Sequence, residues 1–282
     1  MPSKYAFCID KLHTMYTEPW KLEAPAFRVF GNLYFVGNQD GASWLVDTGS
    51  GLILFDANYP TADTLLVDSI WSLGFNPRNL IAIFHTHGHF DHFGATALLK
   101  GLSGAKTYLG AADADMFIKQ PELSCVSDSR NAWLPLFVPD VIVQDGDEFS
   151  FGDTCIHAVA CPGHSPGATS YFFNVTDGKR TLRVGLHGGA GLNTLCRDYR
   201  KAHHVDWQND FAASIEKVLN EPVDIFLGNH TAQNHCLEKY RALQSGADNP
   251  FICKEDWKNF LKDLRERFHT MQEEEANGTD QI

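Results

Sequence analysis

The stretch HTHGHFDH, residues 85–92, contains four histidines and one aspartate and directly follows the apolar run at 81–84. We expect that run to form a short buried strand that leads into a turn. Imidazole nitrogens and carboxylate oxygens are ligands that zinc prefers, at about 2.0–2.2 Å. Gly88 gives the backbone the freedom to bend, so that the side chains on either side converge.

The spacing within this turn is suited to two metal ions. His87 and His89, two residues apart, can grip one ion, while Asp91 and His92 point at a neighbouring position. The alternative is a chance cluster of histidines on a solvated loop. So many ligand types in so short a turn after a strand favour a metal site instead.

Short strands and helices alternate along the rest of the chain. We expect strands at 27–30, 33–36, 43–46, 52–55 and 81–84, followed in the second half by 155–160, 170–175, 182–186 and 225–227. Helical spacing of apolar residues predicts helices at 61–73, 95–100, 206–219 and 257–268. A long loop is expected at 121–139, and a frayed acidic tail at 273–282.

The two sets of elements are not separated by a Pro/Gly/Ser-rich linker. We therefore expect one domain over residues 1–282, with a core at about 25–270. Two sheets packed together with helices outside would give each element a face to bury.

The formal charge of −12, without any basic run, disfavours nucleic acid as a partner. The sequence has no apolar run long enough for a membrane span and no secretory signal pattern, so we expect no membrane association and a cytoplasmic location. The odd number of cysteines without CxxC spacing predicts reduced and mostly buried thiols. They are Cys8, Cys125, Cys155, Cys161, Cys196, Cys236 and Cys253. The oligomeric state is left open.

Residues 86–92 resemble the T-H-x-H-x-D-H signature of the metallo-β-lactamase superfamily. Three further segments match in order: Asp56 at the end of a strand, CPGHSPG at 161–167, and LGNH at 227–230. The second of these resembles the P-G-H-[ST]-x-G turn that carries a third histidine. The resemblance covers roughly residues 25–235 and implies an α/β fold, an αββα sandwich with a two-metal site at one edge.

The resemblance implies two zinc ions per chain and six ligands. His87, His89 and His164 would bind the first ion, and Asp91, His92 and His230 the second. Asp56 would support the site through contacts with its ligands. Many members add an aspartate that bridges both ions, but the corresponding segment here, VGLHGGAGLN at 184–193, has no carboxylate.

Without that carboxylate, the ligand set most resembles the third subclass of metallo-β-lactamases. Those enzymes usually hold a serine near this point, where this chain offers Gly189 or His187. We assign catalytic roles to Asp91 and His187, the latter as a proton donor. His187 could instead be an extra metal ligand or a hydrogen-bonded loop residue. His85 is expected to be structural, and His203, His204 and His235 to be solvated or to support the site.

The implied function is a binuclear zinc hydrolase in which a metal-bound hydroxide cleaves an amide or lactam bond of a small molecule. A β-lactamase of this kind would confer antibiotic resistance. A lactonase, or another cyclic ester or thioester hydrolase, is the alternative, ahead of a redox or non-catalytic member. Arg197, Arg200 and Lys201 are candidates for receiving a substrate carboxylate, or form a solvated charge run. Trp133 and Phe137 either line a pocket or serve packing.

Overall fold

Two β-sheets form the centre of the computed structural model, which describes residues 2–6, 13–127 and 133–281. The first sheet has seven strands in the order β1 (Phe27–Phe30), β2 (Leu33–Phe35), β3 (Trp44–Asp47), β4 (Leu52–Phe55), β5 (Leu80–Phe84), β6 (Lys106–Gly110) and β7 (Val141–Val143). The second has five, in the order β12 (Ile225–Leu227), β11 (Thr181–Leu186), β10 (Thr169–Thr176), β9 (Thr154–Ala160) and β8 (Glu148–Phe151).

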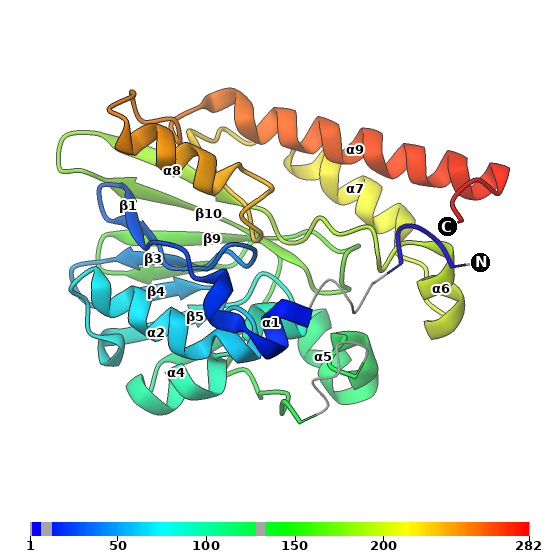
Figure 1. The fold of residues 1–282 in the computed structure, drawn as a ribbon, viewed down its shortest axis with the longest axis horizontal. Helices are drawn as coiled ribbons and strands as arrows, with labels where there is room; N and C mark the ends of the chain where they lie inside the picture. Colours follow the sequence, from blue (N-terminus) through cyan, green and yellow to red (C-terminus); the bar gives the residue numbers. More distant parts are fainter. Residues whose placement is uncertain (1, 7–12, 128–132, 282) are drawn as a thin grey trace.

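Helices cover the outer face of each sheet (Figure 1). The first sheet is covered by α2 (Asp63–Ser72) and α4 (Thr96–Ser103), and the second by α7 (Gln208–Val218) and α9 (Lys254–Asn277). The four layers are the αββα sandwich that the sequence predicts, and this prediction is confirmed. The remaining helices are α1 (His13–Thr17), α3 (Phe90–Phe93), α5 (Ala111–Lys119), α6 (Arg197–His203), α8 (Cys236–Gln244) and short 3-10 turns at Pro19–Leu22, Pro60–Ala62, Pro77–Asn79 and Pro121–Ser124.

Strand β4 shows why the central strands are wholly apolar. Ile53 and Phe55 point into the core between the sheets, while Leu52 and Leu54 point to the helices outside. Phe55 stacks on Phe173 of the opposite sheet with ring centroids 4.8 Å apart. Because both faces are covered, alternation with polar residues disappears and the strand is apolar throughout.

The topology brings several strand ends to one edge. Strands β1 to β4 are antiparallel, whereas β4, β5, β6 and β7 are parallel, as are β11 and β12. The loops that follow β4, β5, β11 and β12 therefore start at neighbouring places. The sheets are joined there, because Trp44 Nε1 donates a hydrogen bond to the Gly228 carbonyl at 2.8 Å. This edge is the place where a site assembled from several loops can form.

The expected strands all exist, with ends shifted by one residue at most. Three strands, β6 to β8, and helices α1, α3, α5, α6 and α8 are not predicted from the sequence, because they are short or lack a clear apolar period. The segment expected to be a loop at 121–139 contains a 3-10 turn at Pro121–Ser124, and 128–132 fall outside the described residues.

The expectation of a frayed acidic tail is wrong, because carboxylates of this segment form ion pairs with arginines of α6. Helix α9 continues to Asn277, and Glu275 Oε2 accepts a hydrogen bond from Arg200 at 2.6 Å. Further on, the buried Asp280 pairs with Arg197 at 3.0 Å. Ser3 forms a β-bridge with Gln281, so the two ends of the described chain lie side by side (Figure 1).

The described cysteines are free thiols, four of them buried (Cys125, Cys161, Cys196 and Cys236), with Cys155 exposed and Cys253 half-buried. Cys8 lies outside the described residues. In the described part of the chain, every helix is too short or too polar to cross a lipid bilayer.

Glu275→Ala tests the contribution of the ordered tail. The side chain is only 9 % exposed and bonds both the backbone N–H of Arg197 and the Arg200 guanidinium. We expect a loss of about 1–2 kcal/mol in the free energy of unfolding, measured by urea denaturation. The exposed Glu273→Ala is the control and should stay within about 0.5 kcal/mol of wild type. Equal stability of the two variants would contradict the ordered tail.

Candidate metal centre

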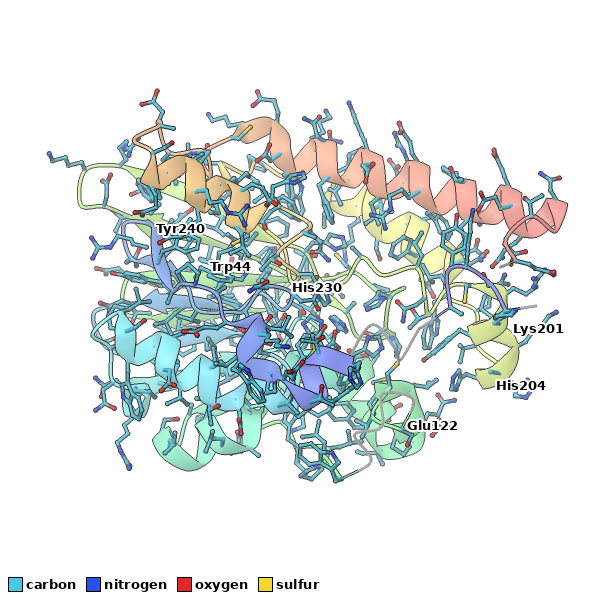
Figure 2. All side chains as sticks on the ribbon, viewed as in Figure 1. Trp44, Glu122, Lys201, His204, His230 and Tyr240 are labelled. Carbon is cyan, nitrogen blue, oxygen red and sulfur yellow. The ribbon has the colours of Figure 1, made fainter. Side chains whose placement is uncertain are left out.

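The six predicted ligands come from four segments that meet at this edge of the sheets. The turn after β5 carries His87 and His89 and runs into α3, which carries Asp91 and His92. The turn between β9 and β10 supplies His164, and the loop after β12 supplies His230. Figure 2 shows His230 at the centre of the molecule, between the two halves of the sandwich.

The first group consists of His87, His89 and His164, whose ligand atoms all lie within 4.8 Å of one another. His89 Nδ1 is 3.1 Å from His164 Nε2. Two nitrogens bound to one tetrahedral zinc ion at about 2.05 Å would stand roughly 3.3 Å apart. The separation is therefore compatible with zinc binding.

The second group adjoins the first. Ligand atoms of His87, Asp91 and His92 also lie within 4.8 Å of one another. Asp91 Oδ2 is 3.5 Å from His92 Nε2 and 3.5 Å from His230 Nε2. The structure thus brings the six residues into two neighbouring groups.

Hydrogen bonds fix which imidazole nitrogen faces the centre. His87 donates through Nδ1 to the Gly188 carbonyl at 2.9 Å, and His164 to that of Gly191 at 2.9 Å. His92 donates through Nδ1 to Asp56 Oδ2 at 2.8 Å. The Nε2 atoms of His87 and His92 are buried, with no hydrogen-bond partner among the described residues. Leaving such an atom unpaired costs about 1–3 kcal/mol, which a metal ion would relieve, so the donor set fits the predicted zinc.

The protonation states also suit a metal. Burial and neighbouring imidazoles lower the pKa of His87 and His89, and burial lowers the pKa of His164 to about 4. These rings are neutral, which is the form that binds metal. Burial acts the same way on His92, but the carboxylates of Asp91 and Asp56 outweigh it and raise its pKa to about 10. Metal binding at this residue must therefore release a proton.

Asp56 supports the centre from behind. Besides His92, it accepts hydrogen bonds from the backbone N–H and the hydroxyl of Thr86, at 2.7 and 2.8 Å. Its backbone is left-handed, with φ 57°, which costs a non-glycine residue roughly 1–2 kcal/mol. Asp56 thus anchors the start of the ligand turn in the way the sequence suggests.

Asp113 on α5 is a supporting residue that the sequence does not reveal. It is fully buried, and its Oδ2 accepts hydrogen bonds from the Gly88 N–H at 2.7 Å and the Ser165 hydroxyl at 2.8 Å. Its Oδ1 accepts one from the Gly167 N–H at 2.6 Å. Burial raises the pKa of Asp113 to about 6, although these hydrogen bonds lower it in part. The carboxylate is therefore ionised at neutral pH and ties the two histidine-bearing turns together.

The glycines after β11 are required by His164. A Cβ on Gly189 would come within 2.6 Å of His164 Cδ2, and one on Gly191 within 2.6 Å of its Cε1. The imidazole therefore lies against bare backbone on both sides. Any side chain at Gly189 or Gly191 would therefore require His164 or the backbone to shift.

His187 is not brought to the ligand groups. Its Nδ1 accepts a hydrogen bond from the Gly189 N–H at 3.2 Å, and its ring packs on Phe260 and Trp257 with centroids 5.6 and 6.0 Å away. Burial lowers its pKa to about 3, so the ring is neutral. Its geometry is that of a buried, hydrogen-bonded loop residue.

A cavity of about 650 Å³ opens over the two groups. It is lined by Tyr59, His87, His89, Phe90, Asp91, Cys125, His164, Ala190, Gly191, Asn193, Asn229, His230, Ala232, Gln233, His235, Phe260, Asp263 and Arg267. Arg197 and Arg200 pair with the tail instead, and Lys201 lies on α6, far from His230 (Figure 2).

Three other residues singled out in the sequence, His85, Phe137 and Trp133, do not line the cavity. His85 donates to the Tyr108 carbonyl at 2.9 Å and accepts from Thr96 at 2.8 Å, and Phe137 packs on its ring. His85 is therefore structural, as expected. Trp133 is 64 % exposed.

Asp113→Asn tests the tie between the two turns. The amide NH2 group cannot accept the hydrogen bonds that Gly88 and Ser165 donate to the carboxylate. The turns that carry His87 and His164 should therefore loosen, and zinc affinity should fall about 10–100-fold. Competition with a chromogenic chelator would measure it. Asp115→Asn, which alters only the exposed pair with Lys119, is the control and should bind zinc as wild type. Unchanged affinity in Asp113→Asn would refute the tie.

Gly189→Ala tests the steric argument around His164. The added methyl group must displace the imidazole, so we expect a loss of zinc from the first group, measured as zinc content after dialysis. Gly101→Ala on α4, where a Cβ meets open space, is the control and should keep its zinc and gain up to about 1 kcal/mol of stability. Full zinc content in Gly189→Ala would show that His164 can move aside.

The sequence is similar in part to proteins of known activity. Over 109 residues it is 30 % identical to a hydroxyacylglutathione hydrolase of Trichodesmium erythraeum, an alignment that covers 38 % of this chain and 34 % of the relative. The chain thus spans only about a third to two fifths of the length of such curated relatives.

Solved structures are similar over nearly the whole fold. A subclass B3 metallo-β-lactamase of Bradyrhizobium japonicum has a TM-score of 0.81 at 28 % identity, covering 93 % of this chain and 98 % of the other. A metallo-β-lactamase of Legionella gormanii has a TM-score of 0.82 at 26 % identity, covering 90 % and 98 %. The sequence itself matches the metallo-beta-lactamase superfamily over residues 36–228. With the fold, the converging ligands and this match in agreement, the chain belongs to the metallo-β-lactamase superfamily.

Proposed function

We propose that this protein is a hydrolase that holds two zinc ions and cleaves the amide bond of a lactam. The observation that carries the proposal is the convergence of buried imidazole nitrogens without hydrogen-bond partners beside an aspartate, at the floor of a cavity. Similarity to lactamases over about nine tenths of the chain supports the choice of reaction.

His87, His89 and His164 would hold one ion, and Asp91, His92 and His230 the other. Zinc, when bound, supplies Lewis acidity toward a carbonyl oxygen and lowers the pKa of water so that it can attack. Burial keeps the imidazoles of His87, His89 and His164 neutral. The carbonyls of Gly188 and Gly191 orient the rings of His87 and His164.

Asp91 is the group suited to orienting the attacking water. Burial alone would raise its pKa, but His92 and His230 outweigh burial and hold the pKa of this carboxyl below its usual range, so the group stays ionised. The carboxylate lies in the wall of the cavity, where it can accept a hydrogen bond from that water. In this scheme His187 stays a supporting residue of the glycine-rich turn.

Polar side chains in the cavity wall can orient a substrate. Asn229 donates to the Gly188 carbonyl at 3.3 Å, while its Oδ1 is buried without a partner among the described residues. Asn193 lies in the same wall. An amide or ring oxygen on a substrate would meet donors and acceptors here, which suits lactams and also lactones.

The first experiment pairs metal content with turnover. We expect about two zinc ions per chain and chelator-sensitive hydrolysis of a chromogenic cephalosporin. His230→Asn should lose at least about 100-fold in kcat with the fold retained, because it removes a ligand. His204→Asn is the control, since His204 is an exposed residue with left-handed backbone that asparagine also adopts.

The outcomes separate the candidates. Cleavage of a homoserine lactone but not of the cephalosporin would replace the lactam by a lactone. Cleavage of a glutathione thioester alone would indicate the activity of a hydroxyacylglutathione hydrolase instead. Absence of bound metal after growth and dialysis with zinc would overturn the proposal.

A further inference from the structure

Helix α9 presents two faces to the rest of the molecule. One face is buried in the core through Trp257, Leu261, Leu264, Phe268 and Met271. A second face lines the cavity through Phe260, Asp263 and Arg267, spaced three and four residues apart. Residues at this spacing lie above one another on a helix, so they form a strip that we call the α9 strip.

Arg267 is the only lysine or arginine among the described residues that line the cavity. Its side chain is 54 % exposed, and its ion pair with Asp263 on the preceding turn spans 3.7 Å. That distance is too long for a hydrogen bond. Among the described residues the guanidinium therefore keeps its donors available, unlike those of Arg197 and Arg200, which bond the tail.

The surroundings make this cation selective. The chain carries a formal charge of −12, which repels anions from most of its surface. Away from the ligand groups, this guanidinium is the one cationic side chain that the described wall offers an anion, and its planar fork matches a carboxylate.

The strip also sets a distance from the ligand groups. Phe260 packs on His187. Gly188, which follows His187 in the chain, accepts the hydrogen bond that orients His87. Phe260 thus marks the metal end of the strip. Arg267 lies seven residues further on, roughly 10 Å along the axis at 1.5 Å per residue.

We propose that Arg267 binds a carboxylate of the substrate that lies away from the bond to be cleaved, with Phe260 contacting the apolar part between them. The substrate class is an elongated amide or ester that carries a remote carboxylate. This inference rests on the proposed function, because it assumes that the cleaved bond lies at the two ligand groups.

The test uses binding to the zinc-loaded protein, so that it does not depend on turnover. The probes are ω-mercaptoalkanoic acids of increasing chain length and their methyl esters, whose thiolates bind zinc. Calorimetry would give the Kd of each pair. At the best chain length we expect the acid to bind about 10-fold more tightly than its ester, a modest factor because Arg267 is half exposed.

Three variants assign the preference to the α9 strip. Arg267→Gln should bind acid and ester equally, and Asp263→Asn should strengthen acid binding about 2–5-fold by removing the competing carboxylate. Arg265→Gln is the control, because that arginine pairs with Glu216 on α7 instead and should keep the wild-type preference.

The outcomes are decisive for each proposal. Equal Kd values for acid and ester in the wild type at every chain length, or a preference that persists in Arg267→Gln, overturn the inference and leave the hydrolase proposal intact. A protein that holds no zinc and binds none of the thiols overturns the proposed function and the inference with it.

Discussion

The buried carboxylate of Asp56 is the constraint on which the centre depends. Asp56 directly follows β4, beside the end of β5. Its carboxylate accepts hydrogen bonds from the N–H and the hydroxyl of Thr86 and from the Nδ1–H of His92. Burying a carboxylate is costly unless hydrogen-bond donors surround it, and here three do. Asp113 does the same on the other side of the turn. Two buried carboxyl groups thus hold the loop on which the imidazoles converge.

Local signals explain what the sequence predicts well. A strand such as β4 is apolar throughout because both of its faces are covered. The ligand turn is a contiguous motif. Both can therefore be recognised from a few consecutive residues of the sequence. Asp113 has no such signal, since its partners Gly88 and Gly167 lie 25 and 54 residues away. The same holds for Glu275, whose partner Arg200 is 75 residues distant. The acidic segment around Glu275 resembles a disordered tail in sequence, because the arginines that pair with it come from a distant part of the chain.

The architecture separates two tasks between different kinds of element. Strand ends and tight turns, held by backbone carbonyls, fix the groups that would hold metal. A surface helix, α9, which is anchored by Trp257 and its neighbours in the core, supplies the cavity wall. Exposed positions on such a helix can change without disturbing the turns, because they share few contacts with them. The cavity wall on α9 and the turns that carry the candidate ligands can therefore change largely independently of each other.

The glycines around His164 also bear on how such sites can evolve. A side chain at Gly189 would collide with a histidine that the first group needs. Any side chain at Gly189 therefore requires a shift of the His164 imidazole or of the backbone. Substitutions at these two contacting positions are coupled, so a side chain could be gained at Gly189 only after, or together with, a change that gives the imidazole another place.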